Sequence, residues 1–167
     1  MSESPKNQEF EIHTIQPGDD PAVAEVIRTV MPEYGACGAG FAIQDAEVDA
    51  MHAAYSAPRS RYFVLKQQGR VVGGAGVAPL AGAGPGVCEL RKMYLLAEAR
   101  GFGQGKRLLG LCLDEAWRMG FDTCYLETTS KMLEAQALYR KLGFQPLPGP
   151  RGNTGHFRCD RWFERRL

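Results

Sequence analysis

A run of alternating glycines lies between basic residues near the middle of the chain. It reads EARGFGQGKRLLG from Glu98 to Gly110, and a leucine-rich segment of helical period follows it. Glycines leave backbone N–H groups uncovered and permit left-handed conformations. Where such a loop enters a helix, free N–H groups and the helix dipole favour negative charge. The loop therefore predicts a phosphate or pyrophosphate site, with added positive charge from Arg100, Lys106 and Arg107.

Two familiar phosphate-binding motifs do not fit this loop. A P-loop needs the pattern G-x-x-x-x-G-K-[ST], but Arg100 stands five positions before Gly105, and Arg107 stands where the hydroxyl residue should follow Lys106. A dinucleotide fingerprint, G-x-G-x-x-G, would begin at Gly101 and would have Lys106 as its third glycine. It also belongs to the first strand of a βαβ unit, whereas antiparallel strands are expected before this loop.

The pattern that fits is R-x-x-G-x-G, from Arg100 to Gly105, between an expected strand and a long helix. Together with ELRKMYLLAEARG before it and A-x-x-L-Y-x-x-x-G-F at Ala135 to Phe144, it resembles the GCN5-related N-acetyltransferase (GNAT) superfamily. The resemblance covers about Val87 to Phe144, and the N-terminal half agrees in element order only. It implies that the loop binds the pyrophosphate of acetyl-CoA, the co-substrate. The cofactor-binding residues that it implies are Met93, Tyr94, Leu95, Arg100, Gly101, Phe102, Gly103, Gln104, Gly105, Lys106 and Tyr139.

Acetyl transfer from a thioester to an amine needs a base and an acid. An alkyl ammonium with a pKa near ~10.4 must lose a proton before it attacks, and the departing thiolate, whose thiol has a pKa near ~8.5, takes one up. The resemblance implies Tyr139 as the acid, with a core aromatic as the alternative. For the base it implies Glu89 first and Glu127, in YLET, second. The alternative for both glutamates is a solvated strand face or a partner of Arg91.

The resemblance also assigns a role to strand backbone. In the family the fourth strand splays from the fifth, and its open edge pairs with the pantetheine arm of coenzyme A. By position, residues 93–95 would supply those backbone groups, and an amide there could polarise the thioester carbonyl. One position departs from the family. Many relatives carry asparagine five residues after the YLE glutamate, where this chain has Met132, so a weaker hold on that part of coenzyme A is expected.

Periodicity and turn signals predict the elements that position these residues. Strands are expected at FEIHTI, on both sides of Gln68-Gly69, and at VCELRKMYLL, TCYLETT and HFRCDRWFERRL. Helices are expected after an N-cap at Asp20, over Asp45 to Tyr55, over Gly105 to Met119, and at MLEAQALYRKLG. This order indicates an α+β class. The resemblance implies a GNAT fold in one domain, residues 1–167: a mixed sheet of six to seven strands, flanked by about four helices and splayed between strands 4 and 5.

The histidines and cysteines predict no metal site. His13, His52 and His156 lack metal-ligand spacing with the five scattered cysteines, which we expect to be reduced thiols. A nucleophilic cysteine, with Cys124 nearest the proposed centre, is the less favoured alternative to a buried apolar residue. In the terminal segment, His156, Arg158, Asp160 and Trp162 would share one strand face, where they would either line an acceptor pocket or seal the sheet edge.

Composition limits the partners. Twenty Lys and Arg against nineteen Asp and Glu give a net charge of +1, which argues against a nucleic-acid-binding surface. The polar opening MSESPKNQEF and the lack of a long apolar run predict a cytoplasmic protein that does not bind membranes. The resemblance implies an acetyltransferase that acts on a small-molecule primary amine by direct transfer in a ternary complex. A protein N-terminus or lysine as acceptor, a non-catalytic coenzyme A-binding module, and a homodimer stay open.

Overall fold

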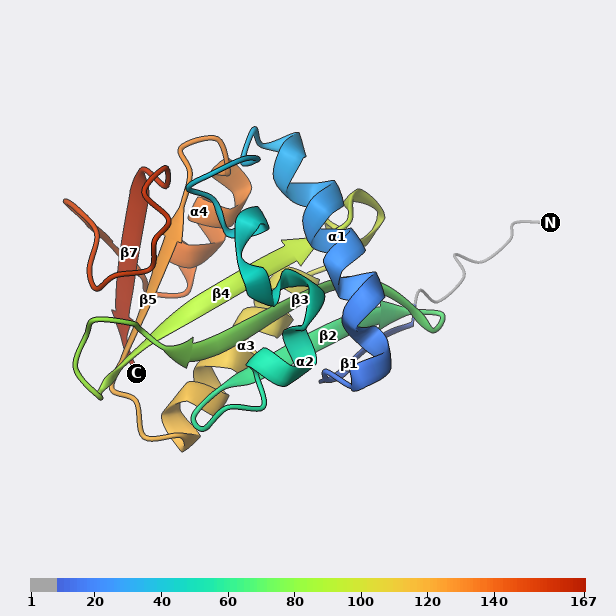
Figure 1. The fold of residues 1–167 in the computed structure, drawn as a ribbon, viewed down its shortest axis with the longest axis horizontal. Helices are drawn as coiled ribbons and strands as arrows, with labels where there is room; N and C mark the ends of the chain where they lie inside the picture. The colour runs from blue at the N-terminus through green and yellow to red at the C-terminus, as the bar shows by residue number, and fades with distance from the viewer. Residues whose placement is uncertain (1–8) are drawn as a thin grey trace.

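The computed structural model describes residues 9–167, which are built on one seven-stranded sheet (Figure 1). Its order is β1-β2-β3-β4-β5-β7-β6, and only β4 and β5 run parallel among the pairs in this sheet. The mixed sheet confirms the expected α+β fold. The strands are β1 (Phe10–Thr14), β2 (Arg61–Gln67), β3 (Arg70–Pro79), β4 (Val87–Leu95), β5 (Thr123–Thr128), β6 (Gln145–Leu147) and β7 (Arg161–Arg166).

Four helices cover the sheet: α1 (Asp20–Glu33), α2 (Met51–Ala54), α3 (Gln104–Arg118) and α4 (Leu133–Lys141). In Figure 1, α1 and the short α2 cross the face turned toward the viewer, and α3 lies behind the sheet. α1 contacts β3 and β4, and α3 contacts β2 and β3. Each of these two long helices buries one apolar stripe, so the core extends on both sides of the sheet. None of the helices in residues 9–167 is long and apolar enough to cross a membrane.

Two expected helices differ from those observed. α1 begins one residue before the predicted start, with Asp19 as N-cap, and the Asp20 carboxylate accepts a hydrogen bond from the backbone N–H of His52 at 2.8 Å. The helix expected over Asp45 to Tyr55 is broken into a 3-10 turn at Ala46–Asp49 and α2. Long-range contacts explain the break, because the side chains of Asp45 and Glu47 both bind Lys92 of β4.

The terminal strand is shorter than expected. β7 begins at Arg161, so His156, Arg158 and Asp160 lie in the loop before it and share no strand face with Trp162. Side chains in this loop bind distant segments instead: the Asp160 carboxylate accepts from Ser130 N–H at 2.8 Å, and the His156 ring binds Asp45. These residues precede the strand, so the predicted shared face is wrong.

β4 and β5 separate soon after they begin. They pair at only three positions, ending at Glu89 opposite Tyr125. Beyond this point β4 continues beside β3, and β5 continues beside β7. The expected splay between strands 4 and 5 is therefore confirmed. Within the described residues, the backbone of 93–95 has no strand on its β5 side.

A bulge in β4 lies at the point of separation. Lys92 has a left-handed backbone (φ 47°), and the register of β3 against β4 shifts between Gly74 and Gly76. The Tyr62 hydroxyl donates to the Lys92 carbonyl at 2.7 Å. Its ring fits because a Cβ on Gly74 or Gly76 would lie only 2.6 or 2.5 Å from ring atoms. The two glycines thus admit the tyrosine that holds the bulge, and bulges commonly redirect side chains beside active sites.

Candidate active site

The glycine loop opens into a cavity of about 330 Å³ at the N-terminus of α3. Gly103 is the N-cap in a left-handed conformation (φ 75°), and no side chain caps the helix, so first-turn N–H groups are available to a ligand. A Cβ on Gly105 would lie 3.3 Å from Leu138 Cδ2 and 3.4 Å from Met93 Cε, so a larger residue would narrow the cavity. The predicted cofactor residues that line it are Met93, Tyr94, Leu95, Arg100, Gly101, Gly103, Gln104, Gly105, Lys106 and Tyr139.

Phe102 and Arg107 point elsewhere. The Phe102 side chain is 51% exposed, and its ring lies 5.7 Å from that of Phe10, outside the cavity lining. The Arg107 side chain donates a hydrogen bond to the Phe10 carbonyl at 3.1 Å and likewise lies outside the cavity lining. Arg100 lines the cavity while it pairs with Glu33 at 2.8 Å. Of the three basic residues expected here, Arg100 and Lys106 are thus the two that line the cavity.

A second, smaller cavity of about 60 Å³ adjoins the first one. The two share Met93, Tyr94, Met132 and Tyr139 in their linings. Tyr139 is 5% exposed, and its ring packs 5.9 Å from Phe144, so it is both a core aromatic and a cavity residue. Burial raises the pKa of its hydroxyl, which therefore carries its proton at neutral pH and can donate it.

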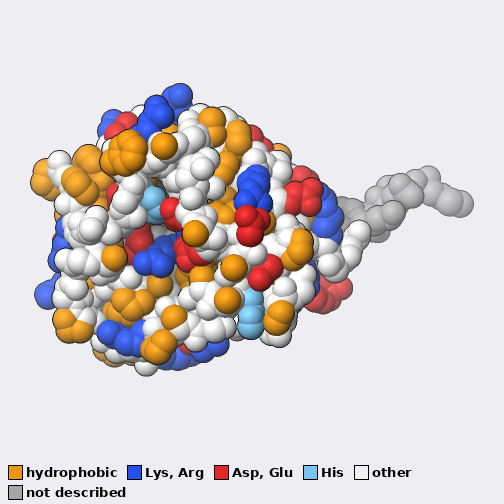
Figure 2. Space-filling view, viewed as in Figure 1, with side chains coloured by type: hydrophobic (Ala, Val, Ile, Leu, Met, Phe, Trp, Pro, Cys, Tyr) orange, Lys and Arg blue, Asp and Glu red, His pale blue; other side chains and the backbone are white. Residues whose placement is uncertain are grey.

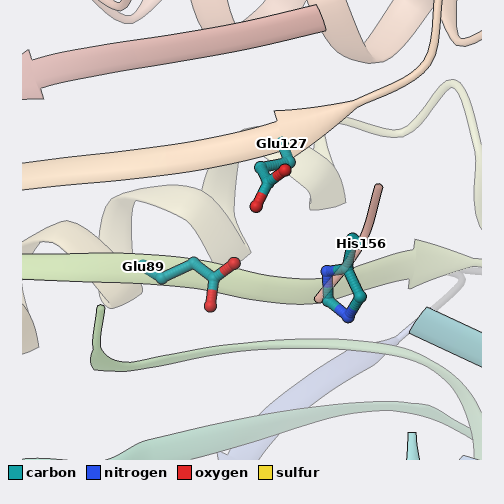
Figure 3. A group of neighbouring side chains, drawn as sticks. All are labelled: Glu89, Glu127 and His156. Atoms are coloured by element: carbon teal, nitrogen blue, oxygen red, sulfur yellow. The ribbon is translucent and has the colours of Figure 1, made fainter. Parts of the chain in front are cut away.

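Glu89 and Glu127 meet in this central cavity, together with His156 (Figure 3). The two glutamates come from neighbouring strands, and their carboxylates point toward one another across the gap between β4 and β5. One nitrogen or oxygen atom from each of the three residues lies within 4.8 Å of the others. Both base candidates from the sequence are thus brought to the same place.

The two glutamates have different surroundings. Glu89 is 4% exposed, and Arg91 Nε donates a hydrogen bond to its Oε1 at 2.6 Å. The alternative from the sequence, in which the glutamate pairs with Arg91, is therefore observed for Glu89. Glu127 Oε1 is buried and has no hydrogen-bond partner among the described residues. Burial raises the pKa of Glu127, and the charge of Glu89 adds to the rise. Glu127 is therefore the carboxyl group that is easier to protonate than an ordinary glutamate.

His156 is the member of this cluster to which the sequence assigned no catalytic part. Its Nε2 lies 3.0 Å from both carboxylate oxygens of Asp45. Asp45 also binds Lys92 at 2.8 Å, and the Lys92 side chain is only 1% exposed. Burial lowers the pKa of His156, but the Asp45 hydrogen bond and charge outweigh it and leave the pKa raised. No local sequence signal marks a loop histidine whose partner lies so far along the chain.

A third cavity, of about 280 Å³, continues from the central one. It shares Glu89, Arg91 and His156 with the central cavity and extends past Asp45 and Glu47. Figure 2, drawn in the view of Figure 1, shows acidic, basic and histidine side chains gathered at a depression on the face turned toward the viewer. The three cavities therefore form a path from the glycine loop, past Tyr139 and the two glutamates, to a polar pocket.

Two cysteines bear on the possibility of a covalent intermediate. Cys159 lines the central cavity, and burial raises its pKa to about 12. Cys124 is fully buried and lines none of the three cavities; a hydrogen bond with Cys88 and burial raise its pKa well above the usual range. Both are thiols rather than thiolates at neutral pH, and a thiol is a poor nucleophile.

The sequence matches the model of the Acetyltransferase (GNAT) family over residues 24–144. Among proteins with sequence similarity is an Escherichia coli K12 protein described as an uncharacterized N-acetyltransferase, YjgM. It is 45% identical over 143 residues, which cover 85% of this chain and 86% of that protein.

The fold is similar to that of solved structures with low sequence identity. An acetyltransferase of the GNAT family from Staphylococcus aureus Mu50 superposes with a TM-score of 0.80 at 19% identity, over 95% of this chain and 99% of the other. YncA from Salmonella typhimurium, whose structure includes its cofactor acetyl-CoA, gives a TM-score of 0.73 at 21% identity, over 95% and 94%. At these identities the two structures establish the fold alone.

Proposed function

Because this chain belongs to the Acetyltransferase (GNAT) family, we propose that it transfers an acetyl group from acetyl-CoA to a primary amine of a small molecule, directly in a ternary complex. The observation that carries the proposal is the path of three adjoining cavities. Its first cavity fits a phosphate-bearing carrier, its centre holds groups that take and give protons, and its far end is a separate polar pocket.

The first cavity supports the choice of acetyl-CoA. The uncapped first turn of α3 and the nearby Lys106 suit a pyrophosphate, and the free edge of β4 at 93–95 suits an amide-bearing arm. A Cβ on Gly101 or Gly103 would have nothing within 4 Å, which fits a loop that leaves its backbone open to a ligand. Acetyl-CoA supplies an acetyl group activated as a thioester. The related structure of Salmonella YncA holds this same cofactor.

The central cavity supplies the proton transfers that the reaction needs. Glu89 and Glu127 lie together on the acceptor side, where either can take the ammonium proton directly or through a water molecule. Tyr139 lines both this central cavity and the first one, and its hydroxyl is protonated at neutral pH, so it can supply the proton that a leaving thiolate requires. Arg91 holds Glu89 in position through its Nε.

The state of the cysteines supports direct transfer. Neither Cys159 nor Cys124 is ionised near neutral pH, so neither would readily form an acetyl-cysteine. All five cysteines are free, which is typical of proteins in a reducing compartment and favours the cytoplasm as the location. The third cavity, at about 280 Å³, lies at the small end of ligand pockets and favours a small acceptor over an extended peptide.

Two measurements test this function. Acetyl-CoA should raise Tm, because a ligand that binds only the folded state stabilises it, whereas ATP and NAD should give much smaller shifts. Release of the coenzyme A thiol should depend on an added amine. Equal stabilisation by NAD would contradict the acetyl-CoA assignment. Stabilisation by acetyl-CoA without thiol release for any amine would instead identify a non-catalytic coenzyme A-binding module.

A further inference from the structure

The acceptor side of the path carries more carboxylates than cations. The central and third cavities are lined by the carboxylates of Asp45, Glu47, Glu89 and Glu127 and by the cations Arg91 and Lys92. Negative charges therefore exceed positive ones by two while His156 is neutral, and by one when it is protonated. The chain as a whole has a net charge of +1, so this local negative excess has the opposite sign to the overall charge.

The two cations are already bound by the protein. Lys92 Nζ contacts both Asp45 and Glu47, and its side chain is almost fully buried. Arg91 donates through Nε to Glu89 and through Nη2 to the Pro79 carbonyl at 3.0 Å. An acceptor that carried a carboxylate would meet the negative excess and would have to compete with these contacts for a cation. The lining thus disfavours anionic acceptors.

We propose that the acceptor is a primary amine that bears a second cationic group, of the diamine or polyamine class. The proposal rests on the proposed function and names the substrate class of the same site. Asp45 and Glu47 share Lys92, so while His156, which lies against Asp45, is neutral, one carboxylate charge is left over in the third cavity, where the distal ammonium would bind. The reacting nitrogen lies at the other end, near Glu89 and Glu127.

The charge balance of the transfer shows what a second ammonium would add. The reacting ammonium gives its proton to a glutamate carboxylate before its nitrogen forms the new N–C bond. The C–S bond of the thioester then breaks, the thiolate takes a proton from Tyr139, and the proton that the acetylated nitrogen loses as it becomes an amide restores the Tyr139 hydroxyl. The proton transfer to the glutamate leaves the net charge of the pocket unchanged, because the glutamate that takes the proton loses its charge as the ammonium does. The reacting end therefore offsets one of the two excess negative charges before and after the transfer, and while His156 is neutral a second ammonium can offset the other.

A panel of matched amines tests the class on the unmodified protein. Three acceptors of similar reach are compared by thiol release from acetyl-CoA: 1,4-diaminobutane, 1-aminopentane and 5-aminopentanoate. The expected order of kcat/KM is diamine, then neutral amine, then anionic amine. The diamine should exceed 1-aminopentane by about 10- to 100-fold, the factor that one charge-assisted hydrogen bond supplies. This advantage should shrink as ionic strength rises.

Equal use of 1-aminopentane and the diamine, or a preference for 5-aminopentanoate, would overturn the substrate class and leave the acetyltransferase proposal standing. Failure of every amine to release thiol while acetyl-CoA still binds would overturn the proposed function and this class with it. The two failures are therefore distinguishable in one set of assays.

Variants that remove one carboxylate charge test whether the preference for the diamine arises in the third cavity. Glu47→Gln should lower the ratio of diamine to 1-aminopentane activity, and Asp45→Asn should do the same if Glu47→Gln fails to fold. Glu25→Gln, which removes a carboxylate from the exposed side of α1, is the matched control and should keep the wild-type ratio. A wild-type ratio in both pocket variants would contradict the assignment of the distal ammonium to this cavity.

Discussion

The carboxylates of Glu89 and Glu127 lie within 4.8 Å of one another across the gap that opens where β4 and β5 part. The two strands pair at Glu89 opposite Tyr125, so Glu127, two residues farther along β5, falls just beyond the last pair. Arg91 neutralises Glu89, whereas Glu127 has a buried oxygen without a partner. This asymmetry leads to different expectations for the two glutamates.

Removal of the Glu89 carboxylate should slow the reaction in a way that depends on pH. For Glu89→Gln we expect kcat at neutral pH to fall by about 10²- to 10⁴-fold, the usual contribution of a general base. Activity should recover partly toward pH 10, because the amine then loses its proton unaided. Thiol release measured from pH 6 to 10 checks this, with Glu25→Gln as control. Wild-type turnover at pH 7 would transfer the role of base to Glu127.

Glu127→Gln should stabilise the fold near neutral pH. Burial and the Glu89 charge raise the pKa of Glu127 in the folded protein above its unfolded value. The folded state therefore favours the protonated form, and stability falls as pH rises through the unfolded pKa of about 4.3 toward the folded one. Glutamine removes this loss, so Tm of the variant should exceed that of the wild type at pH 7. This difference in Tm should vanish below about pH 4. An equal increase in Tm at all pH values would contradict a raised pKa of Glu127 as its cause.

A larger side chain at Gly105 should weaken cofactor binding. Leu138 and Met93 would lie 3.3 and 3.4 Å from a new Cβ, so Gly105→Leu would push into the cavity and cover the loop amides. Calorimetry with coenzyme A should show an affinity loss of at least about tenfold, equivalent to the loss of one charge-assisted hydrogen bond. Gly110→Ala lies in the same helix, with nothing within 4 Å of its added Cβ, and should bind normally. Unchanged affinity in Gly105→Leu would place the phosphates elsewhere.

Local patterns predicted the elements that carry the site. The hairpin at Gln68-Gly69, the strand that became β4, and the helices that became α3 and α4 agree with the structure to within a few residues. Each of these depends on signals that are close in sequence, such as glycine turns and apolar stripes of one period. The splay between β4 and β5 was predicted from the family resemblance and not from periodicity. Which strands pair across a crossover connection cannot be read from the residues of one short segment.

Contacts between distant segments account for what the sequence did not reveal. Asp45 binds both Lys92 and His156, which breaks the expected second helix and draws the loop before β7 over the site. The left-handed conformation of Lys92 likewise depends on Tyr62 from another strand. Such pairs require the folded chain, so propensity within a short window could not indicate them.

Tyr139→Phe separates catalysis from packing. The ring packs against Phe144 and Phe163, and phenylalanine preserves that apolar volume, so Tm should change little. If the hydroxyl protonates the leaving thiolate, kcat should fall by about 10²- to 10⁴-fold while coenzyme A affinity is nearly unchanged. Steady-state kinetics and calorimetry on the same preparation provide both values. Wild-type turnover with the acceptor would remove Tyr139 from the mechanism and pass the acid role to solvent.

His156→Gln should remove a pH dependence from both stability and acceptor binding. Asp45 raises the folded pKa of His156 above its unfolded value of about 6.5, despite burial. The stability that this supplies is complete below about pH 6.5 and is lost as pH rises through the folded pKa. Loss of the imidazolium charge also leaves the acceptor pocket more negative, because Asp45, Glu89 and Glu127 remain around it.

For the wild type we therefore expect Tm to fall, and KM for a cationic amine to fall as well, as pH rises above 6.5. Both inflections should be absent in His156→Gln, whereas His52→Gln, at a histidine outside the three cavities, should retain them. Thermal melts and acceptor kinetics in half-unit steps from pH 5.5 to 8.5 measure the two effects. An inflection in KM that survives in His156→Gln would assign the titration to another group and separate His156 from the charge balance of the pocket.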